Sequence, residues 1–257
     1  MPEQSVEKST VLITGAAKRI GRAIAVDMAR HGWAVAIHYN TSAKAAKEAV
    51  EEIRDNGGSA AALQADLEDL DAVRNLLPAC AEALETPRCL INNASLFEQD
   101  GVSSLSPDSF HRHMRINLRA PVFLAQAFAA NLVPPAEGTI INILDQRVWK
   151  LTPDYFSYTI SKAGLWTATQ TMAQALSPRI RVNAIGPGPT LANTRQSEAV
   201  FAKQQQATPL GRGAELREIC SAVRFILDAP SMTGQMIALD GGQHLAWRTP
   251  DVTDADE

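Results

Sequence analysis

The stretch VLITGAAKRIGRAIA, residues 11–25, decides the fold. Residues 11–13 form an apolar run of strand type, and Gly15 permits a tight turn directly after it. Residues 19–31 then carry apolar side chains at helical spacing, at Ile20, Ala23, Ile24 and Met28. A strand that turns at a glycine into a helix presents unpaired N–H groups and the positive end of the helix dipole to an anion such as a pyrophosphate.

Two basic residues and a second glycine make this loop a candidate phosphate site. Lys18 and Arg19 supply positive charge, and Gly21 would let the backbone approach a bound molecule closely. The candidate binding residues of the loop are Gly15, Lys18, Arg19, Ile20 and Gly21. The usual Gly-x-Gly-x-x-Gly spacing is absent, so a plain strand-to-helix turn remains an alternative. A Gly-x-x-x-x-Gly-Lys-Ser/Thr loop is also absent, which argues against an NTPase.

Short apolar runs and helical stretches alternate along the rest of the chain. We expect strands at 34–37, 60–64, 89–91, 139–144, 180–185 and 236–239, and helices at 42–55, 69–84, 107–130, 155–176 and 215–227. Ser42 is a plausible N-cap of its helix. Continuously apolar strands separated by helices predict a parallel sheet covered on both faces. The sequence therefore predicts one α/β domain over residues 1–257, with its core at about 10–245.

Two segments stand outside this alternation. Residues 187–209 combine Gly188 and Pro189 with a polar run, and a long connection inside a compact domain is often functional. We expect this segment to be a substrate lid. The acidic tail, residues 250–257, is expected to be solvated.

The bulk composition narrows the class of protein. The chain has 257 residues, of which 46% are hydrophobic, and its net charge of −4 gives no basic character suited to nucleic acid. Cys80, Cys89 and Cys220 show no paired spacing, and the polar start lacks an apolar leader. No apolar stretch approaches the roughly 18–20 residues that span a bilayer. These features predict a soluble cytoplasmic protein with neither a nucleic-acid nor a membrane partner.

The end of the second strand, His38-Tyr39-Asn40-Thr41-Ser42, bears on the choice of dinucleotide. A dinucleotide fold specific for NAD carries an acid there, which binds the ribose 2′-hydroxyl. No acid is present, and the donors of Arg19, Asn40 and Ser42 would suit a 2′-phosphate. NADP(H) is therefore favoured, with His38, Tyr39, Asn40 and Ser42 as candidate cofactor contacts. His38 alternatively has a structural role at the strand end.

An acid at the end of an apolar strand precedes a Tyr-x-x-x-Lys pair. Asp145 follows the run Ile-Ile-Asn-Ile-Leu, and Tyr158 and Lys162 share one face of an expected helix. An ammonium beside a phenol favours the phenolate and should lower the pKa of Tyr158 toward neutrality, which makes Tyr158 a general acid or base. Asp145 could instead cap local N–H groups at the strand end.

Further motifs follow in a fixed order: Thr14-Gly15, Gly21, Asp66, Asn92-Asn93-Ala94, Asn117, RVNAIGPG at 181–188 and LDGG at 239–242. With Tyr158 and Lys162 they resemble the short-chain dehydrogenase/reductase family over roughly residues 10–242. The resemblance implies a single Rossmann-like domain with a doubly wound, seven-stranded parallel sheet, NAD(P) as cofactor and frequently a homotetramer. It also implies site roles: Asp66 and Leu67 at the adenine, Asn93 and Ala94 near the ribose, Lys162 at the nicotinamide ribose, Asn117 supporting a proton-relay water, and Pro187 and Gly188 near the nicotinamide.

Two positions depart from the family pattern. Arg19 replaces the usual middle glycine of the loop, and Asp145 replaces the usual catalytic serine. A carboxylate has no proton to donate to a carbonyl oxygen and would repel a developing alkoxide. Both departures resemble the pteridine reductases, as do the segments TGAAKRIGR, HYNTSA and NNASLF. That resemblance implies that Arg19 contacts NADPH, Asp145 pairs with Tyr158, Ser95 binds cofactor and pterin, and Phe97 stacks on the pterin; Tyr155 also matches.

We therefore predict an NADPH-dependent reductase of a pterin-like ring, at C=N bonds of the dihydropterin or dihydrofolate type. The ring N–H groups are donors that suit Asp145. One alternative is an ordinary short-chain reductase of a carbonyl or secondary alcohol. Another is a non-catalytic NADP-binding regulatory protein, against which the intact Asn117, Tyr158 and Lys162 argue.

Five further residues have a second interpretation. Phe97 could belong to the core rather than to the site. Arg147 and Trp149 either line the mouth of the site or lie on the surface. His111 and His113 point apart on a helix, so no metal is expected.

Overall fold

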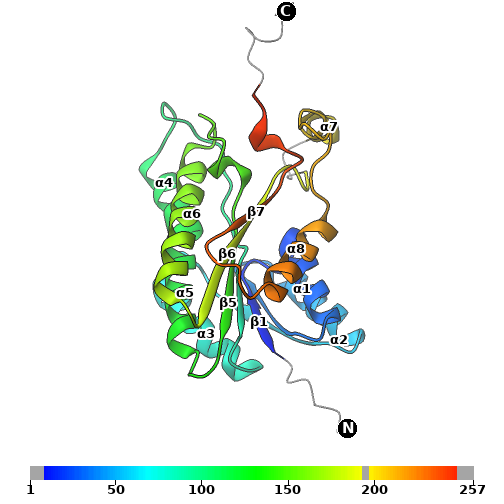
Figure 1. Cartoon of the computed structure of the whole chain (residues 1–257), viewed down its shortest axis with the longest axis vertical. Helices are drawn as coiled ribbons and strands as arrows, with labels where there is room; N and C mark the ends of the chain where they lie inside the picture. The colour runs from blue at the N-terminus through cyan, green and yellow to red at the C-terminus, as the bar shows by residue number, and fades with distance from the viewer. Residues whose placement is uncertain (1–8, 193–196, 248–257) are drawn as a thin grey trace, which may run out of the picture.

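The structure is a computed structural model that describes residues 9–192 and 197–247. The acidic tail and residues 193–196 of the expected lid lie outside the described residues. The predicted architecture is confirmed: one seven-stranded parallel sheet has the order β3-β2-β1-β4-β5-β6-β7, with helices on both faces (Figure 1). The strands are β1 (Thr10–Ile13), β2 (Ala34–Tyr39), β3 (Ser59–Gln64), β4 (Cys89–Asn92), β5 (Gly138–Ile143), β6 (Ile180–Pro187) and β7 (Met236–Leu239).

Each face of the sheet packs against its own set of helices (Figure 1). One set is α1 (Arg19–Arg30), α2 (Ala43–Asp55) and α8 (Leu216–Asp228); the other is α3 (Leu70–Ala83), α4 (Pro107–Met114), α5 (Ala120–Asn131) and α6 (Phe156–Leu176). In α1 the buried residues Gly21, Ile24, Ala25 and Met28 form the stripe that the sequence spacing predicts. The residues of the five inner strands are buried with few exceptions, as a doubly covered parallel sheet requires, whereas the edge strands β3 and β7 are partly exposed.

The strand order reverses between β1 and β4, which creates a crevice at their carboxyl ends. The backbone N–H groups of Asn93 and Ala94, just after β4, both donate to the Thr14 hydroxyl at 3.0 Å. These two bonds connect the end of β4 to the first glycine loop at the base of the crevice.

The structure corrects two expected elements. The expected helix 107–130 is interrupted by a π-helical turn, η1 (Arg115–Arg119), between α4 and α5. Within the expected irregular segment 187–209 lies a helix, α7 (Glu198–Gln206), which starts at the Ser197 cap and buries none of its residues. A helix without an apolar stripe leaves no periodic signal in the sequence, which is why it was not expected. Ser42 does precede α2, but its side chain makes no capping hydrogen bond.

Two short 3-10 turns, η2 (Gln146–Val148) and η3 (Gln243–Leu245), complete the described chain. No helix within the described ranges is long and apolar enough to cross a membrane.

Candidate active site

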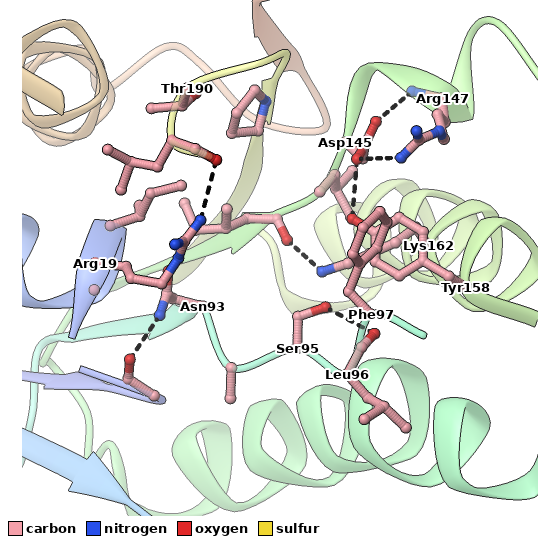
Figure 2. Close-up of a pocket in the computed structure, with 18 of the residues that line it drawn as sticks. Arg19, Asn93, Ser95, Leu96, Phe97, Asp145, Arg147, Tyr158, Lys162 and Thr190 are labelled. Carbon is pink, nitrogen blue, oxygen red and sulfur yellow. Dashed lines mark hydrogen bonds and ion pairs between the residues drawn. The ribbon is translucent and has the colours of Figure 1, made fainter. Parts of the chain in front are cut away.

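A cavity of about 930 Å³ lies at the carboxyl ends of the strands and gathers most of the predicted site (Figure 2). We name its parts after the groups that the sequence analysis expects there: the phosphate end at the first loop, the adenine side after β3 and the reaction end around Tyr158. The predicted residues that line it are Gly15, Lys18, Arg19, Ile20, Gly21, His38, Asn40, Asp66, Leu67, Asn93, Ala94, Ser95, Phe97, Asp145, Tyr158, Lys162, Pro187 and Gly188. The predicted residues Tyr39, Ser42 and Asn117 do not line it.

The first glycine loop is built around close backbone contacts within the protein. Gly15 has a φ of +63°, and a Cβ there would lie 2.9 Å from the Cα of Ala94. At Gly21 a Cβ would lie 2.5 Å from both the Gly15 carbonyl oxygen and the Asn93 amide nitrogen. The absence of a side chain at Gly21 therefore lets the helix pack closely on the loop and on Asn93, and Gly21 also lines the cavity as expected.

The start of α1 has the features of an anion site. No side chain caps it, and no acidic residue lies in its first turn. Lys18 and Arg19 are exposed beside it. The chemistry of this donor set therefore fits the pyrophosphate of a dinucleotide.

Arg19 takes a backbone conformation that normally belongs to glycine. Its φ is 55°, in the left-handed region, at the position where the family pattern has glycine. Its guanidinium donates to the carbonyl oxygens of Ala192 at 2.7 Å and Leu191 at 3.1 Å. A non-glycine residue held there costs of order 1 kcal/mol, which suggests a functional reason for its side chain.

Replacing Arg19 by glycine is expected to weaken NADPH binding about tenfold and NADH binding much less, because a charged donor near the 2′-phosphate is removed. Dinucleotide titrations followed by fluorescence measure both affinities. Arg22→Met is the matched control, since Arg22 pairs with Glu52 at 2.9 Å outside the cavity. An equal loss for NADPH and NADH would contradict a 2′-phosphate contact.

The adenine side is organised by His38 and Asp66. The buried His38 ring accepts from the Gly15 N–H at Nδ1 (3.0 Å), so its Nε2 donates to the Ala65 carbonyl oxygen at 3.1 Å. Burial lowers the pKa of His38, partly offset by the Ala65 bond and the charge of Asp66. Asp66 accepts from the Glu68 N–H (2.9 Å) and from the Asn40 amide (3.4 Å). His38 is thus a brace between two loops as well as part of the cavity wall.

The reaction end joins Asp145 to Tyr158. The Tyr158 hydroxyl donates to Asp145 Oδ2 at 3.0 Å, as predicted (Figure 2). Asp145 also caps η2, since its Oδ1 accepts from the Arg147 N–H at 2.9 Å. Both readings of Asp145 therefore hold at once: one oxygen caps the local backbone and the other meets the phenol.

The expected low pKa of Tyr158 is wrong for the protein alone. Burial raises the pKa of Tyr158 well above its ordinary value, the charge and hydrogen bond of Asp145 raise it further, and Arg147 opposes the shift. The Lys162 ammonium donates to the Ile143 carbonyl oxygen at 2.7 Å and lies 5.8 Å from the centre of the Tyr158 ring. The acid therefore accepts a hydrogen bond from the phenol, whereas the ammonium donates to the Ile143 carbonyl. Tyr158 therefore keeps its proton in the protein alone.

The pKa of Lys162 predicts the pH above which activity should fall. Burial lowers the pKa of Lys162 to about 8, against the opposing effect of Asp145. Because the ammonium loses its proton as the pH rises through this value, kcat/KM for NADPH is expected to fall above pH 8. A pH profile from 6 to 10 measures this at 340 nm, and a flat profile to pH 9.5 would be incompatible with the assignment.

A second wall of the reaction end is aromatic. Phe97 stacks on Tyr155 with ring centres 4.3 Å apart and planes within 8°, and it meets Tyr158 edge-on at 4.7 Å. Phe97 is only half-buried and lines the cavity, so it belongs to the site rather than to the core. Tyr155 precedes α6 with a left-handed φ of 58°.

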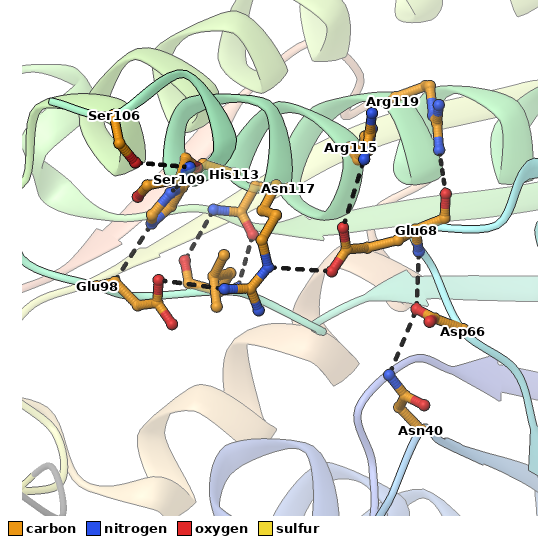
Figure 3. Close-up of polar contacts among 12 residues, drawn as sticks. Asn40, Asp66, Glu68, Glu98, Ser106, Ser109, His113, Arg115, Asn117 and Arg119 are labelled. Carbon is orange, nitrogen blue, oxygen red and sulfur yellow. Dashed lines mark hydrogen bonds and ion pairs between the residues drawn. The ribbon is translucent and has the colours of Figure 1, made fainter.

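The segment formed by α4 and η1 holds two cavity loops in place (Figure 3). On the adenine side, Arg112 and Arg115 pair with Glu68 at 3.2 and 3.8 Å. On the aromatic side, Arg112 reaches Glu98 at 3.5 Å, and the buried His113 accepts from the Glu98 N–H.

The side-chain amide of Asn117, on η1, makes four hydrogen bonds within the protein. Its oxygen accepts from the Leu96 N–H (2.7 Å) and the Ser95 hydroxyl (3.3 Å), and its nitrogen donates to the Leu96 carbonyl (2.9 Å) and the Ser161 hydroxyl (3.0 Å). The amide therefore ties the Ser95–Leu96 loop to α6. A relay water would have to meet the backbone of Asn117, because these bonds occupy the side chain.

Sequence reasoning missed or left undecided the lining residues that come from outside the motifs. Arg147 lines the cavity, which settles its two readings, whereas Trp149 does not line it and packs on His244 and Trp166. The residues that were missed are Leu96, Ile116, Ile143, Leu144, Gln146 and Gln243. The expected lid segment contributes Pro189, Thr190, Leu191, Val200, Phe201 and Gln204, and Tyr155, noted in the sequence, also lines the cavity. Among the described residues no group of three or more His, Cys, Asp or Glu side chains could hold a metal ion.

The comparisons with known proteins point to reductases. A family model described as enoyl-(acyl carrier protein) reductase matches residues 15–244. An uncharacterised oxidoreductase of Methylorubrum extorquens is 31% identical over 245 residues, which is 92% of this chain and 98% of that protein. A 3-oxoacyl-(acyl carrier protein) reductase of Synechocystis is 30% identical over 236 residues, which is 90% of this chain and 95% of that protein.

Two solved structures are more similar. FolM alternative dihydrofolate reductase 1 from Brucella suis, in complex with NADP, is 50% identical with a TM-score of 0.92, over 95% of this chain and 98% of that chain. The protein of the same name from Brucella canis, also with NADP, is 50% identical with a TM-score of 0.93, over 95% of this chain and 97% of that chain.

Proposed function

The chain belongs to the short-chain dehydrogenase/reductase family of oxidoreductases, and from this premise we propose that it uses NADPH to reduce C=N bonds of pterin-like rings of the dihydropterin or dihydrofolate type. The observation that carries the proposal is the bond from Tyr158 to Asp145, an acid where the family pattern has a serine. The two Brucella neighbours, named alternative dihydrofolate reductases, support the same substrate class.

NADP(H) is the cofactor of the proposed reaction, and the residues of the cavity fit it. The uncapped start of α1, with Lys18 and Arg19, would hold the phosphates. Asp66 and Leu67 would contact the adenine, and Lys162 would hold the nicotinamide ribose beside Pro187 and Gly188. The similar structures named above contain NADP.

Reduction of a C=N bond needs a hydride for the ring carbon and a proton for the ring nitrogen. NADPH, when bound, would supply a hydride to the ring carbon. Tyr158 holds a proton at its hydroxyl, and Asp145 accepts that hydrogen bond while offering acceptor oxygens to ring N–H groups. A proton passing from Tyr158 to the ring nitrogen completes the reduction of C=N to CH–NH, and solvent restores the phenol.

The ring would lie against Phe97, with Ser95 at its edge. Phe97 and Ser95 both line the cavity. The Ser95 hydroxyl donates to the Asn117 side-chain oxygen, which fixes its orientation. A flat bicyclic ring buries more area on such a wall than an aliphatic ketone does.

The test is to incubate the pure protein with NADPH and a panel of oxidised and dihydro pterins, dihydrofolate included, and to follow absorbance at 340 nm. Single-turnover oxidation of bound NADPH would also exclude a non-catalytic regulatory role. No oxidation above background with any pterin, together with clear turnover of an aliphatic ketone, rejects the proposal.

A second candidate, reduction of a carbonyl, is favoured by the names of the curated relatives. The family model and the Synechocystis relative are both named as acyl-carrier-protein reductases. The Synechocystis relative is 30% identical to this chain, which is lower than the 50% of the Brucella structures. Substitution of Asp145 is the experiment that distinguishes this candidate from pterin reduction.

We also propose a cytoplasmic homotetramer, on the family resemblance and the three buried, unpaired cysteines. Light scattering after size-exclusion chromatography measures the assembly directly.

A further inference from the structure

Arg147 is a largely buried arginine at the centre of the reaction end. It lies on η2, two residues after Asp145, and its side chain is 16% exposed. It lines the cavity, and its Nε atom is buried without a hydrogen-bond partner among the described residues. A buried guanidinium is costly unless it is paired, so its contacts should explain its presence.

The first contact fixes the direction of Asp145. The Arg147 backbone N–H binds Asp145 Oδ1 at 2.9 Å, and Nη1 lies 3.4 Å from Oδ2 (Figure 2). The same Oδ2 accepts from the Tyr158 hydroxyl. Three donors therefore hold the carboxylate, and two of them come from Arg147.

The second contact is with the aromatic wall. The Arg147 Cζ atom lies 5.5 Å from the centre of the Phe97 ring and 5.1 Å from that of Tyr155. These rings are the stacked pair described above. One guanidinium thus contacts both the acid of the reaction end and the wall on which a flat ring would lie.

The charge of Arg147 also balances that of Asp145. An unpaired carboxylate at this position would make the reaction end negative, and it would strengthen the hold of Tyr158 on its proton. Arg147 opposes that effect, because its charge lowers the pKa of Tyr158.

We propose that Arg147 is a positioning and specificity residue: it aligns Asp145 with Tyr158 and stiffens the Phe97–Tyr155 wall, so that flat heteroaromatic rings are favoured over aliphatic carbonyl compounds. This inference rests on the proposed function. Its two roles depend on different properties of the side chain, since the alignment needs a cation and the wall needs a planar group.

The test compares Arg147→Lys and Arg147→Met with the wild type. Steady-state rates with NADPH give kcat and KM for a dihydropterin and for an aliphatic ketone. Calorimetry gives the affinity of an oxidised pterin in the presence of NADP⁺, where no hydride can be transferred. Arg74→Met is the matched control, because Arg74 also lies over a ring, 5.8 Å from the centre of Phe123, outside the cavity.

For Arg147→Met we expect kcat on the dihydropterin to fall about tenfold or more and pterin binding to weaken about tenfold, with a smaller change on the ketone. Arg147→Lys should recover kcat to within about threefold but not the pterin affinity, because lysine keeps the charge and loses the planar contact. Arg74→Met should match the wild type. A common thermal midpoint, measured by circular dichroism, shows that the variants are folded; if Arg147→Met is not folded, Arg147→Lys alone gives the split between kcat and affinity.

Three outcomes overturn parts of this scheme and are distinguishable. If wild-type protein neither binds nor reduces any pterin, the proposed function fails and the role of Arg147 fails with it. If the wild type is active but a folded Arg147→Met variant keeps kcat and pterin affinity within about twofold, only the role of Arg147 fails. If lysine does not recover kcat, the alignment does not depend on charge, and that half of the inference is overturned.

Discussion

Tyr158→Phe is expected to lower kcat for pterin reduction by about 10²- to 10⁴-fold, with NADPH affinity within about threefold of the wild type. The substitution removes the single hydroxyl that donates to Asp145 at the reaction end. The phenyl ring keeps the edge contact with Phe97, so the wall is retained. Single-turnover decay of bound NADPH at 340 nm measures the loss directly, without interference from product release.

The control is Ser231→Ala, which also removes one hydroxyl, at an exposed residue that does not line the cavity. It should leave kcat and NADPH affinity within about twofold. A Tyr158→Phe variant that retains more than a tenth of wild-type kcat would show that another group donates the proton. The acid role of Tyr158 would then have to be abandoned.

Substitution of Asp145 should have the second-largest effect, and its sign depends on the substrate. Asp145→Ser restores the family's hydroxyl donor and removes the acceptor that suits ring N–H groups. We expect turnover of dihydropterins to fall about 10²-fold or more, while any turnover of an aliphatic ketone persists or rises. Parallel assays of both substrates on one preparation measure the ratio. If pterin turnover survives in Asp145→Ser, the role given to Asp145 is wrong, and if only the ketone is turned over by the wild type and the variant, the carbonyl reading is correct.

Asp145→Asn separates charge from shape. It keeps an acceptor for the Arg147 N–H and the size of the side chain, but it leaves the guanidinium without an anionic partner. We expect it to lower pterin turnover as well, because Tyr158 and Arg147 both lose the carboxylate. Asp154→Ser, at an exposed position of the same loop, is the control for a general effect of losing an acid.

The fold could be predicted because its signals are local and apolar. The alternation of buried strands with helices such as α1, whose buried residues follow the helical period, is visible in the residues themselves. α7 could not be found in this way, because it buries no residue and so has no apolar stripe. The π-helical turn at η1 was also hidden, since a change of one residue in hydrogen-bond register leaves the helical character of the sequence intact.

The site was predictable where short motifs carry it. Asp145, Tyr158 and Lys162 meet as their spacing and the family resemblance indicate. The direction of the pKa shift of Tyr158 was not predictable. It depends on burial and on which charged group is nearer, and tertiary packing sets both. Arg147 illustrates the same limit: a residue two places after a strand end can point to solvent or into the site, and only the turn geometry of η2 decides.

Under the proposed function, the α4–η1 segment would couple dinucleotide binding to ring binding during evolution. Arg112 touches Glu68, beside the adenine loop, and Glu98, beside Phe97. A mutation at Arg112 is therefore expected to affect both loops. Selection for a different nucleotide would act with fewer side effects at Thr41, an exposed residue beyond the end of β2.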